Sequence, residues 1–162
     1  MSVDVATSAE QDWMARAIEL ATTNVDSGGG PFGALIVRDG EIIATGTNQV
    51  TVDLDPTAHA EVTAIRNACR VLGTFKLTGC VLVTSCEPCP MCLAAALWAR
   101  VDRVLFAADR DDAADAGFDD RAFYEAFEDP DENCPTPVRR VEMANRNAAF
   151  DAWRGKTDRV SY

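Results

Sequence analysis

Three residues of this chain have the types and the spacing that bind a transition metal. His59 is the only histidine, and Cys89 and Cys92 lie further along the chain as a Cys-x-x-Cys pair. One imidazole and two thiolates supply three ligands to Zn²⁺ and leave the fourth tetrahedral position open for water. Sulfur and imidazole donors also favour zinc over magnesium or calcium. The pattern therefore predicts a catalytic zinc ion held by His59, Cys89 and Cys92.

A glutamate two residues after the histidine has the chemistry to move protons at such a site. Zinc lowers the pKa of bound water towards about 7, and a nearby base must accept the proton that the water loses. Glu61 is not needed as a ligand and fits this role. In isolation Glu61 would be interpreted as a solvated helix residue, but the neighbouring metal site favours catalysis.

A third nearby cysteine leaves the ligand set open. Cys86 and Cys89 also form a Cys-x-x-Cys pair, and three of the six cysteines lie between residues 86 and 92, which suits a metal better than disulfides. Cys89 and Cys92 are preferred because they follow Pro88 and open a predicted helix, whose N-terminus helps thiols to ionise. A closed site that also used Cys86 would be structural, with no position left for water.

The metal ligands come from the starts of two predicted helices. Asp55-Pro56 predicts a helix start, with Asp55 as the cap, which places His59 and Glu61 in the first turn or so. Apolar residues then recur on one face of this helix, which predicts that this face is buried. The second helix, over residues 88–99, is apolar nearly all round and is expected to be packed on more than one side.

The other elements up to residue 109 alternate between predicted helices and strands. Ser8 and Gln11 form a capping box that opens an amphipathic helix. Asp39-Gly40 predicts a tight hairpin turn. The glycine run before Pro31 lacks the Lys-Ser/Thr of a phosphate loop and predicts a close backbone turn instead. Strands are predicted over residues 32–37, 41–45, 81–84 and 101–107.

The chain becomes acidic after residue 109. This acidic segment contains four aromatic residues between residues 118 and 127, which argues against disorder. It predicts a short helix over residues 121–127, a last strand over 138–143 and another short helix over 148–154. Helices between strands imply parallel pairing beyond the first hairpin. The expected fold class is therefore α/β, with three α/β/α layers and a mixed five-stranded sheet.

The composition indicates a soluble globular protein with a small substrate. The 162 residues, 48% hydrophobic and 25% charged, fit one domain with its own core. A net charge of −11 without a local basic cluster disfavours nucleic acid as a partner, although a general role in solubility explains the acidity equally well. No apolar run approaches the roughly 20 residues of a membrane helix, and the N-terminus does not resemble a secretory signal. A cytoplasmic location is therefore expected, without membrane partners.

Two motifs resemble the cytidine/deoxycytidylate deaminase superfamily: TAHAEVTAIR over residues 57–66 and TSCEPCPMC over residues 84–92. Over residues 12–162 the chain is more closely similar to the small bacterial guanine deaminases. That similarity includes GGPFGALIV, AGFDD, and an AWR segment followed by a terminal tyrosine. The zinc motif is shared by many deaminases, whereas AGFDD and the tyrosine-ended tail are more specific.

The resemblance implies a cytidine-deaminase-like fold and the hydrolysis of guanine to xanthine and ammonia, a step of purine salvage or catabolism. It implies one zinc ion per subunit, Glu61 as proton shuttle, and Asp120 as the residue that assists departure of the exocyclic amine. The residues implied to contact the purine are Phe32, Asn48, His59, Ala60, Trp98, Phe118 and Tyr162. A single domain over residues 1–162 is expected, in a homodimer that exchanges a C-terminal segment from about residue 144 so that Tyr162 reaches the partner's site.

Other functions stay open on the sequence alone. The segments 128–137 and 155–162 vary among related sequences, so guanosine or another aminated ring remains an alternative substrate. A tRNA adenosine deaminase shares the zinc motif but needs a basic path for the RNA, and AGFDD disfavours cytosine and cytidine. Phe32 and Trp98 could be core residues, and Asp120 a solvated acid or helix cap. A zinc-stabilised binding module without catalysis is the non-enzymatic alternative.

Overall fold

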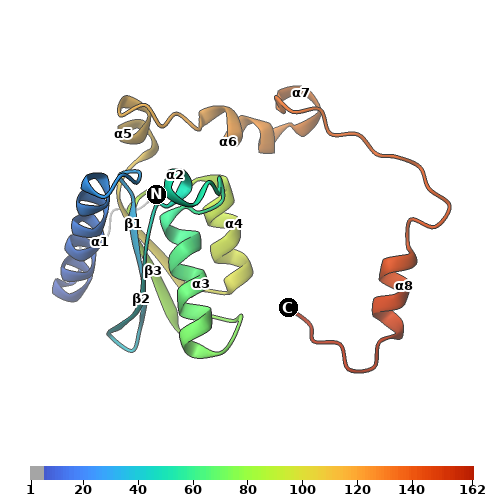
Figure 1. Ribbon diagram of the computed structural model, residues 1–162, viewed down its shortest axis with the longest axis horizontal. Helices are drawn as coiled ribbons and strands as arrows, with labels where there is room; N and C mark the ends of the chain where they lie inside the picture. Colours follow the sequence, from blue (N-terminus) through green and yellow to red (C-terminus); the bar gives the residue numbers. More distant parts are fainter. Residues whose placement is uncertain (1–5) are drawn as a thin grey trace. The chain divides into compact units, whose positions relative to one another are not determined.

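The computed structural model describes residues 6–162, apart from the side chains of residues 130 and 131. The chain forms two compact units, Met1–Arg121 and Ala122–Tyr162. The first unit contains the sheet and the predicted metal ligands (Figure 1). No helix among the described residues is long and apolar enough to cross a membrane.

The first unit is built on a mixed four-stranded sheet with the order β2-β1-β3-β4. Its strands are β1 (Gly33–Arg38), β2 (Glu41–Thr47), β3 (Cys80–Cys86) and β4 (Arg103–Ala108). β1 pairs antiparallel with β2 and β3, and β3 pairs parallel with β4. The predicted parallel pairing is therefore found between β3 and β4. β2 runs in the same direction as β3, but β1 lies between them.

The predicted fifth strand, over residues 138–143, is wrong. These residues have no regular secondary structure and are exposed. The apolar spacing of Val138, Val141 and Met143 is compatible with a strand, but a strand persists only where a neighbour satisfies its backbone N–H and C=O groups. No ladder among the described residues includes this segment. The α/β class is confirmed, with four strands instead of five.

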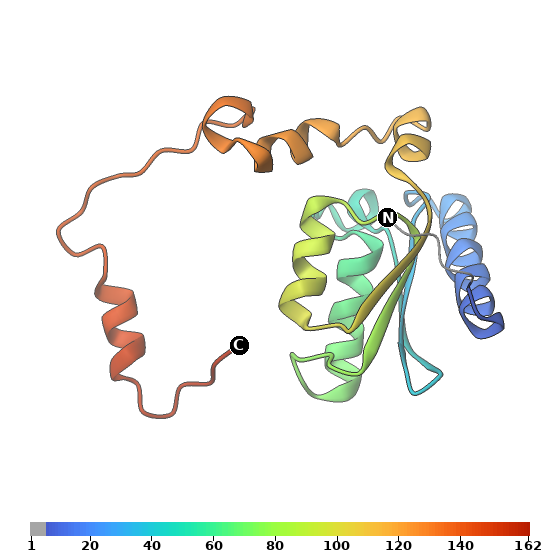
Figure 2. The same cartoon turned by 180° about the vertical axis from the view of Figure 1, so that it is seen from behind.

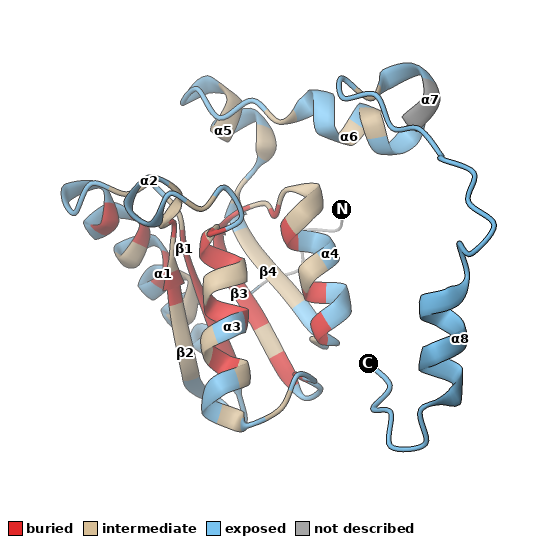
Figure 3. Cartoon of the chain, turned by 45° about the vertical axis from the view of Figure 1, so that its right-hand side comes forward, coloured by how far each residue is buried: buried red, intermediate tan, exposed pale blue. Residues whose placement is uncertain are grey.

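Helices cover both faces of the sheet, which confirms the three-layer arrangement (Figure 2). One face packs against α1 (Ser8–Asp26), where Ala17 joins Leu35, Val37 and Val83 in one buried cluster. The other face packs against α3 (Ala60–Leu72) and α4 (Pro90–Ala99) in a second cluster that is rich in alanine. The buried residues lie mainly in the strands and on the helix sides that face them (Figure 3).

Two glycines allow these helices to approach the sheet closely. A Cβ at Gly46 on β2 would lie 2.2 Å from the carbonyl oxygen of Ala60 in α3, and one at Gly33 would lie 2.5 Å from the carbonyl oxygen of Ala17 in α1. Any larger residue would push the helix away. Gly46 therefore determines how closely the start of α3, next to His59 and Glu61, approaches the sheet.

Local signals for turns and caps are mostly confirmed. Asp39 and Gly40 both have positive φ, 51° and 81°, as the predicted hairpin turn requires. The predicted capping box is displaced by one residue: Thr7 and Glu10 form it, because Thr7 Oγ1 accepts from Glu10 N and Glu10 Oε2 accepts from Thr7 N. Glu10 also binds Arg103 at 2.8 Å, which links the start of α1 to β4.

The helix α4 is less enclosed than its composition predicts. Cys92, Ala96 and Ala99 are buried, but Leu97 and Trp98 are 67% and 61% exposed. One side of α4 therefore packs against the rest of the first unit, and the opposite side presents apolar surface.

Three short helices follow residue 120: α6 (Arg121–Glu128), α7 (Pro130–Asn133) and α8 (Ala148–Gly155). The first and the last confirm the helices predicted over residues 121–127 and 148–154. In the second unit, Phe123 and Phe127 of α6 and Phe150 and Trp153 of α8 are exposed. These helices carry apolar side chains that need a surface to cover them.

Candidate metal centre and active site

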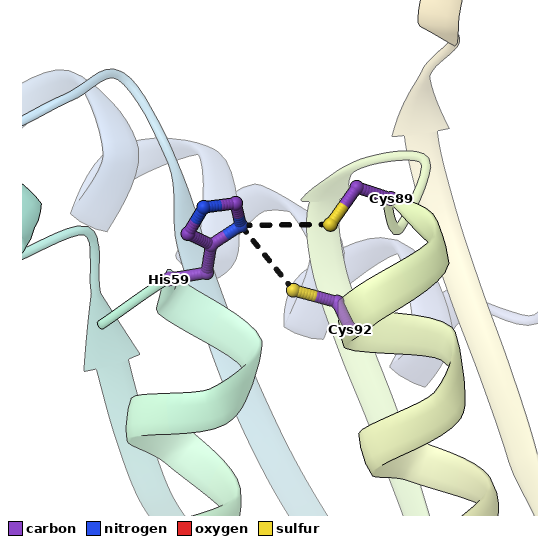
Figure 4. A group of neighbouring side chains, drawn as sticks. All are labelled: His59, Cys89 and Cys92. Atoms are coloured by element: carbon purple, nitrogen blue, oxygen red, sulfur yellow. Dashed lines mark hydrogen bonds between the residues drawn. The ribbon is translucent and has the colours of Figure 1, made fainter. Parts of the chain in front are cut away.

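The helices α3 and α4 begin side by side, and their first residues carry the predicted metal ligands (Figure 4). His59 is the N-cap of α3 and Cys89 is the N-cap of α4. Cys92 lies in the first turn of α4 and is buried. Ligands at two helix starts were expected, and the unpaired N–H groups there stabilise thiolates.

The predicted start of α3 at Asp55-Pro56 is wrong. Asp55 Oδ1 accepts hydrogen bonds from the N–H and the hydroxyl of Thr57, at 2.8 and 2.7 Å. This side-chain turn competes with the first helical turn, so residues 55–58 form a turn instead. His59 consequently has extended backbone angles, φ −67° and ψ 157°, and lies just outside the helix.

The three ligand atoms have the spacing of a tetrahedral zinc site. His59 Nδ1 lies 3.6 Å from Cys89 Sγ and 3.4 Å from Cys92 Sγ (Figure 4). Zinc bonds of about 2.0–2.1 Å to nitrogen and about 2.3 Å to sulfur, at a tetrahedral angle, place N and S about 3.5 Å apart. All three atoms lie within 4.8 Å of one another. The two nitrogen–sulfur distances are therefore those that one Zn²⁺ ion between the three atoms requires.

The charges of these groups also suit a cation. The hydrogen bond from Cys92 and, to a lesser extent, contact with His59 lower the pKa of the Cys89 thiol to about 4. The pKa of Cys92 is raised, because its thiol proton is shared between Cys89 and, more weakly, Glu61, and because the thiol is buried. The hydrogen bond to Cys89 raises the pKa of His59. The pair therefore holds one negative charge by itself, and a second thiolate requires the positive charge that Zn²⁺ supplies.

Cys86 does not join the ligand group. Its Sγ donates to the carbonyl oxygen of Asp109 over 3.7 Å, and burial raises its pKa to about 11. Among the described residues, the group with metal-binding geometry consists of His59, Cys89 and Cys92. The geometry supports three ligands and an open position, and it does not support the closed alternative.

Glu61 lies beside the ligands and is only 6% exposed. Its Oε1 accepts from the hydroxyl of Thr84 at 3.2 Å, and its Oε2 accepts from Cys92 Sγ at 3.4 Å. Burial raises the pKa of Glu61, which is the direction expected of a group that must exchange protons. Thr84, on β3, was not singled out from the sequence. Its signal in the sequence is that Thr84, like Ser85, is a polar residue that follows the apolar part of the strand leading to the cysteines.

The segment after β4 brings Phe118 and Asp120 towards this centre. It begins with α5 (Arg110–Asp115), which is joined to the loop before α4 by an ion pair of 2.5 Å between Arg110 and the partly buried Glu87. Phe118 packs edge to face on Phe32, with ring centroids 5.0 Å apart. Burial, and then the negative charge of Cys89, raise the pKa of Asp120.

Asn48 follows β2 and is 7% exposed. Its backbone N–H donates to the carbonyl oxygen of Phe32 at 3.1 Å, and its Oδ1 accepts from Val50 N at 3.2 Å. Because Oδ1 is engaged, Nδ2 is the group that Asn48 can offer as a donor to a ring acceptor.

The remaining predicted contacts are Ala60, Trp98 and Tyr162. Ala60 is buried at the first position of α3. Trp98 lies six residues beyond Cys92, about 9 Å along the helix axis, in a shallow depression with Ala94, Leu97 and Arg100. The structure does not bring Trp98 to the metal ligands of its own chain. Tyr162 ends the second unit and is 75% exposed.

Comparison with known proteins agrees with this site. Residues 7–108 match the family model described as the cytidine and deoxycytidylate deaminase zinc-binding region. The chain therefore belongs to the cytidine and deoxycytidylate deaminase family, and His59, Cys89 and Cys92 form the candidate site for its zinc ion.

Within this family, the chain is 51% identical to the guanine deaminase of Bacillus subtilis, over 94% of this chain and 98% of that protein. An X-ray structure of guanine deaminase from Bacillus subtilis superposes with a TM-score of 0.91, over 94% of this chain and 98% of that one. The tRNA-specific adenosine deaminase of Aquifex aeolicus is 46% identical over 57% of this chain and 61% of that protein.

Proposed function

We propose that this protein is a zinc-dependent guanine deaminase that converts guanine and water to xanthine and ammonia. The observation that carries the proposal is similarity to a guanine deaminase over 94% of the chain. That similarity extends well beyond the zinc-binding region, which ends at residue 108. It therefore includes the Phe118–Asp120 segment, where substrate-specific contacts are expected.

When bound, zinc supplies Lewis-acid chemistry and lowers the pKa of water to about 7. Glu61 takes the proton from the attacking water at a carboxylate oxygen and delivers it to N3 of the ring as oxygen adds to C2. Zn²⁺ would be held by His59, Cys89 and Cys92 and would require Cys92 as a thiolate, which would free Oε2 of Glu61 for this exchange, while the Thr84 hydroxyl would still donate to Oε1. Asp120 binds the exocyclic amine. The proton that remains on the new C2 hydroxyl passes through Glu61 or Asp120 to this amine, so the C2–N bond breaks, ammonia leaves and the C2 oxygen becomes the carbonyl of xanthine.

The ring is held by residues that present complementary surfaces. Phe32 and Phe118 form an aromatic pair that supplies an apolar contact for a planar base. The Nδ2 of Asn48 donates to an acceptor on the ring, and His59 and Ala60 line the start of α3. The acidic charge of −11 suits a small base better than tRNA, whose phosphates it repels.

We also propose a homodimer in which the segment from about residue 144 is exchanged and Tyr162 contacts the partner's purine. Support comes from apolar side chains on both units: Leu97 and Trp98 on α4, and Phe150 and Trp153 on α8. Apolar patches of this kind commonly mark subunit interfaces. The six cysteines are free thiols, which fits a reducing compartment, and we place the protein in the cytoplasm.

A substrate screen tests the function. Ammonia release is measured with the zinc-loaded protein on guanine, guanosine, cytosine, cytidine and adenine. Guanine should be the best substrate by kcat/KM. Release from guanosine in preference to guanine would redirect the proposal to a nucleoside, and release from adenine or cytosine but not guanine would refute it.

A further inference from the structure

A buried asparagine joins the two loops that carry Phe32 and Asn48. Asn24, near the end of α1, is 6% exposed. Its Nδ2 donates to the carbonyl oxygens of Gly30 and Asn48, each at 2.8 Å, and its Oδ1 accepts from Gln49 Nε2 at 3.2 Å. Because two carbonyls can only accept, they define which side of the Asn24 amide carries the hydrogens. Every polar group of this side chain is therefore used to hold other loops.

The glycine run before β1 is shaped around this amide. A Cβ at Gly29 would lie 2.3 Å from Asn24 Nδ2 and 2.6 Å from the carbonyl oxygen of Asn48. A Cβ at Gly30 would lie 3.0 Å from both Cγ and Oδ1 of Asn48. The run forms the close backbone turn that its composition predicts. Because its glycines have no side chains, Asn24 and Asn48 can pack directly against its backbone.

The same network reaches Phe32. The carbonyl oxygen of Gly30 accepts from Phe32 N at 2.9 Å as well as from Asn24, and the carbonyl oxygen of Phe32 accepts from Asn48 N at 3.1 Å. Phe32 in turn packs on Phe118. A shift of the Asn24 amide would therefore move the aromatic contact and the Asn48 donor together.

We propose that Asn24 is a positioning residue for substrate binding, which sets the distance between the Phe32 ring and the Asn48 amide. The inference rests on the proposed function, in which these two residues contact the purine. Asn24 does not itself touch the substrate, because its hydrogen-bonding groups are engaged with Gly30, Asn48 and Gln49. The ligand whose binding Asn24 affects is a planar base with a hydrogen-bond acceptor.

The test is Asn24→Asp in the full-length, zinc-loaded protein. The substitution keeps the size of the side chain but places a carboxylate oxygen against two carbonyl oxygens. KM for guanine and the Kd of the guanine analogue 8-azaguanine should each rise roughly tenfold or more, while kcat changes by less than about threefold. Zinc content should stay at one ion per chain.

Asn67→Asp is the matched control. Asn67 Nδ2 donates to the carbonyl oxygen of Thr45 at 2.9 Å, so it joins a helix to a strand with the same chemistry but does not hold the Phe32 loop. This variant should lower the melting temperature without raising KM. If Asn24→Asp lowers the melting temperature in the same way and leaves KM and Kd unchanged, the inference is overturned.

Gln49→Ala gives a second, independent measurement should Asn24→Asp fail to fold. It removes the donor to Asn24 Oδ1 and so loosens the Asn24 amide, while Phe32 and Asn48 are unchanged, so KM should again rise with little change in kcat. Unchanged KM in this variant overturns the inference. A wild-type protein that does not turn over guanine overturns the proposed function and this inference with it, whereas normal guanine turnover with unaffected variants overturns the inference alone.

Discussion

Thr84 offers a direct test of how the buried carboxylate of Glu61 is held. The Thr84 hydroxyl donates to Glu61 Oε1 over 3.2 Å, and Thr84 is fully buried on β3. Thr84→Val keeps the shape and the strand preference of the side chain but removes the donor. The Glu61 carboxylate then loses the contact that orients it towards the metal ligands.

The expected effect is on the rate of the chemical step. A hydrogen bond to a charged group contributes about 1.5–3 kcal/mol. About 1.4 kcal/mol corresponds to a factor of ten in rate, so kcat for guanine should fall roughly tenfold to a hundredfold. KM should change much less, because Glu61 moves protons in the transition state and does not hold the ring in the ground state.

Ammonia release from guanine by the zinc-loaded variant gives both constants, and zinc content per chain is measured on the same sample. Thr84→Ser is the matched control: it keeps the hydroxyl and should retain most of kcat, despite a lower melting temperature from the lost methyl group. A valine variant with wild-type kcat and full zinc content would refute the reasoning. Loss of zinc from that variant would refute it too, because the defect would then lie in the metal site.

Further predictions concern the proton shuttle, the metal, the tail and acid stability. Glu61→Gln should lose nearly all turnover and keep its zinc, because an amide cannot accept the proton; ammonia release at the wild-type rate would leave Glu61 without a catalytic role. Chelation of zinc should abolish activity and lower the melting temperature, and added Zn²⁺ should restore both; a metal-free protein that still releases ammonia would contradict this. Truncation from Arg159 onward should cut activity with zinc still bound, and co-expression of this form with full-length Glu61→Gln should restore part of it if tails exchange between subunits. Failure of that complementation, with mixed dimers present, would argue against exchange. The hydrogen bond from Arg110 lowers the pKa of Glu87 in the folded protein below its ordinary 4.5. The ion pair between these residues therefore stabilises the fold fully above pH 4.5, and this stabilisation is lost as the pH falls through the lowered pKa of Glu87. The difference in melting temperature between wild type and Arg110→Gln should therefore shrink below about pH 4.5, and a constant difference would show that the ion pair is not the cause.

The sequence by itself determines the metal chemistry. A single histidine and a Cys-x-x-Cys pair leave few ways to build a zinc site, and ligand type decides which metal is preferred. Local backbone rules likewise determine the Asp39-Gly40 turn and the left-handed Gly73 that ends α3, since both depend on neighbouring residues only. The zinc ligands and the layered α/β order follow from signals of this local kind, whereas the start of α3 does not.

Tertiary structure decides which residues distant in sequence become hydrogen-bond or strand-pairing partners. Asp55 caps a side-chain turn instead of α3, and residues 138–143 have strand-like spacing but no pairing strand. Thr84 meets Glu61 across 23 residues, and Asn24 meets Asn48 across 24. No local pattern identifies such pairs, because each depends on how helices and strands distant in sequence pack together. The metal ligands can be predicted from residue type and spacing, whereas the residues that orient Glu61 and Asn48 emerge only when the sheet brings α1, α3 and β3 together.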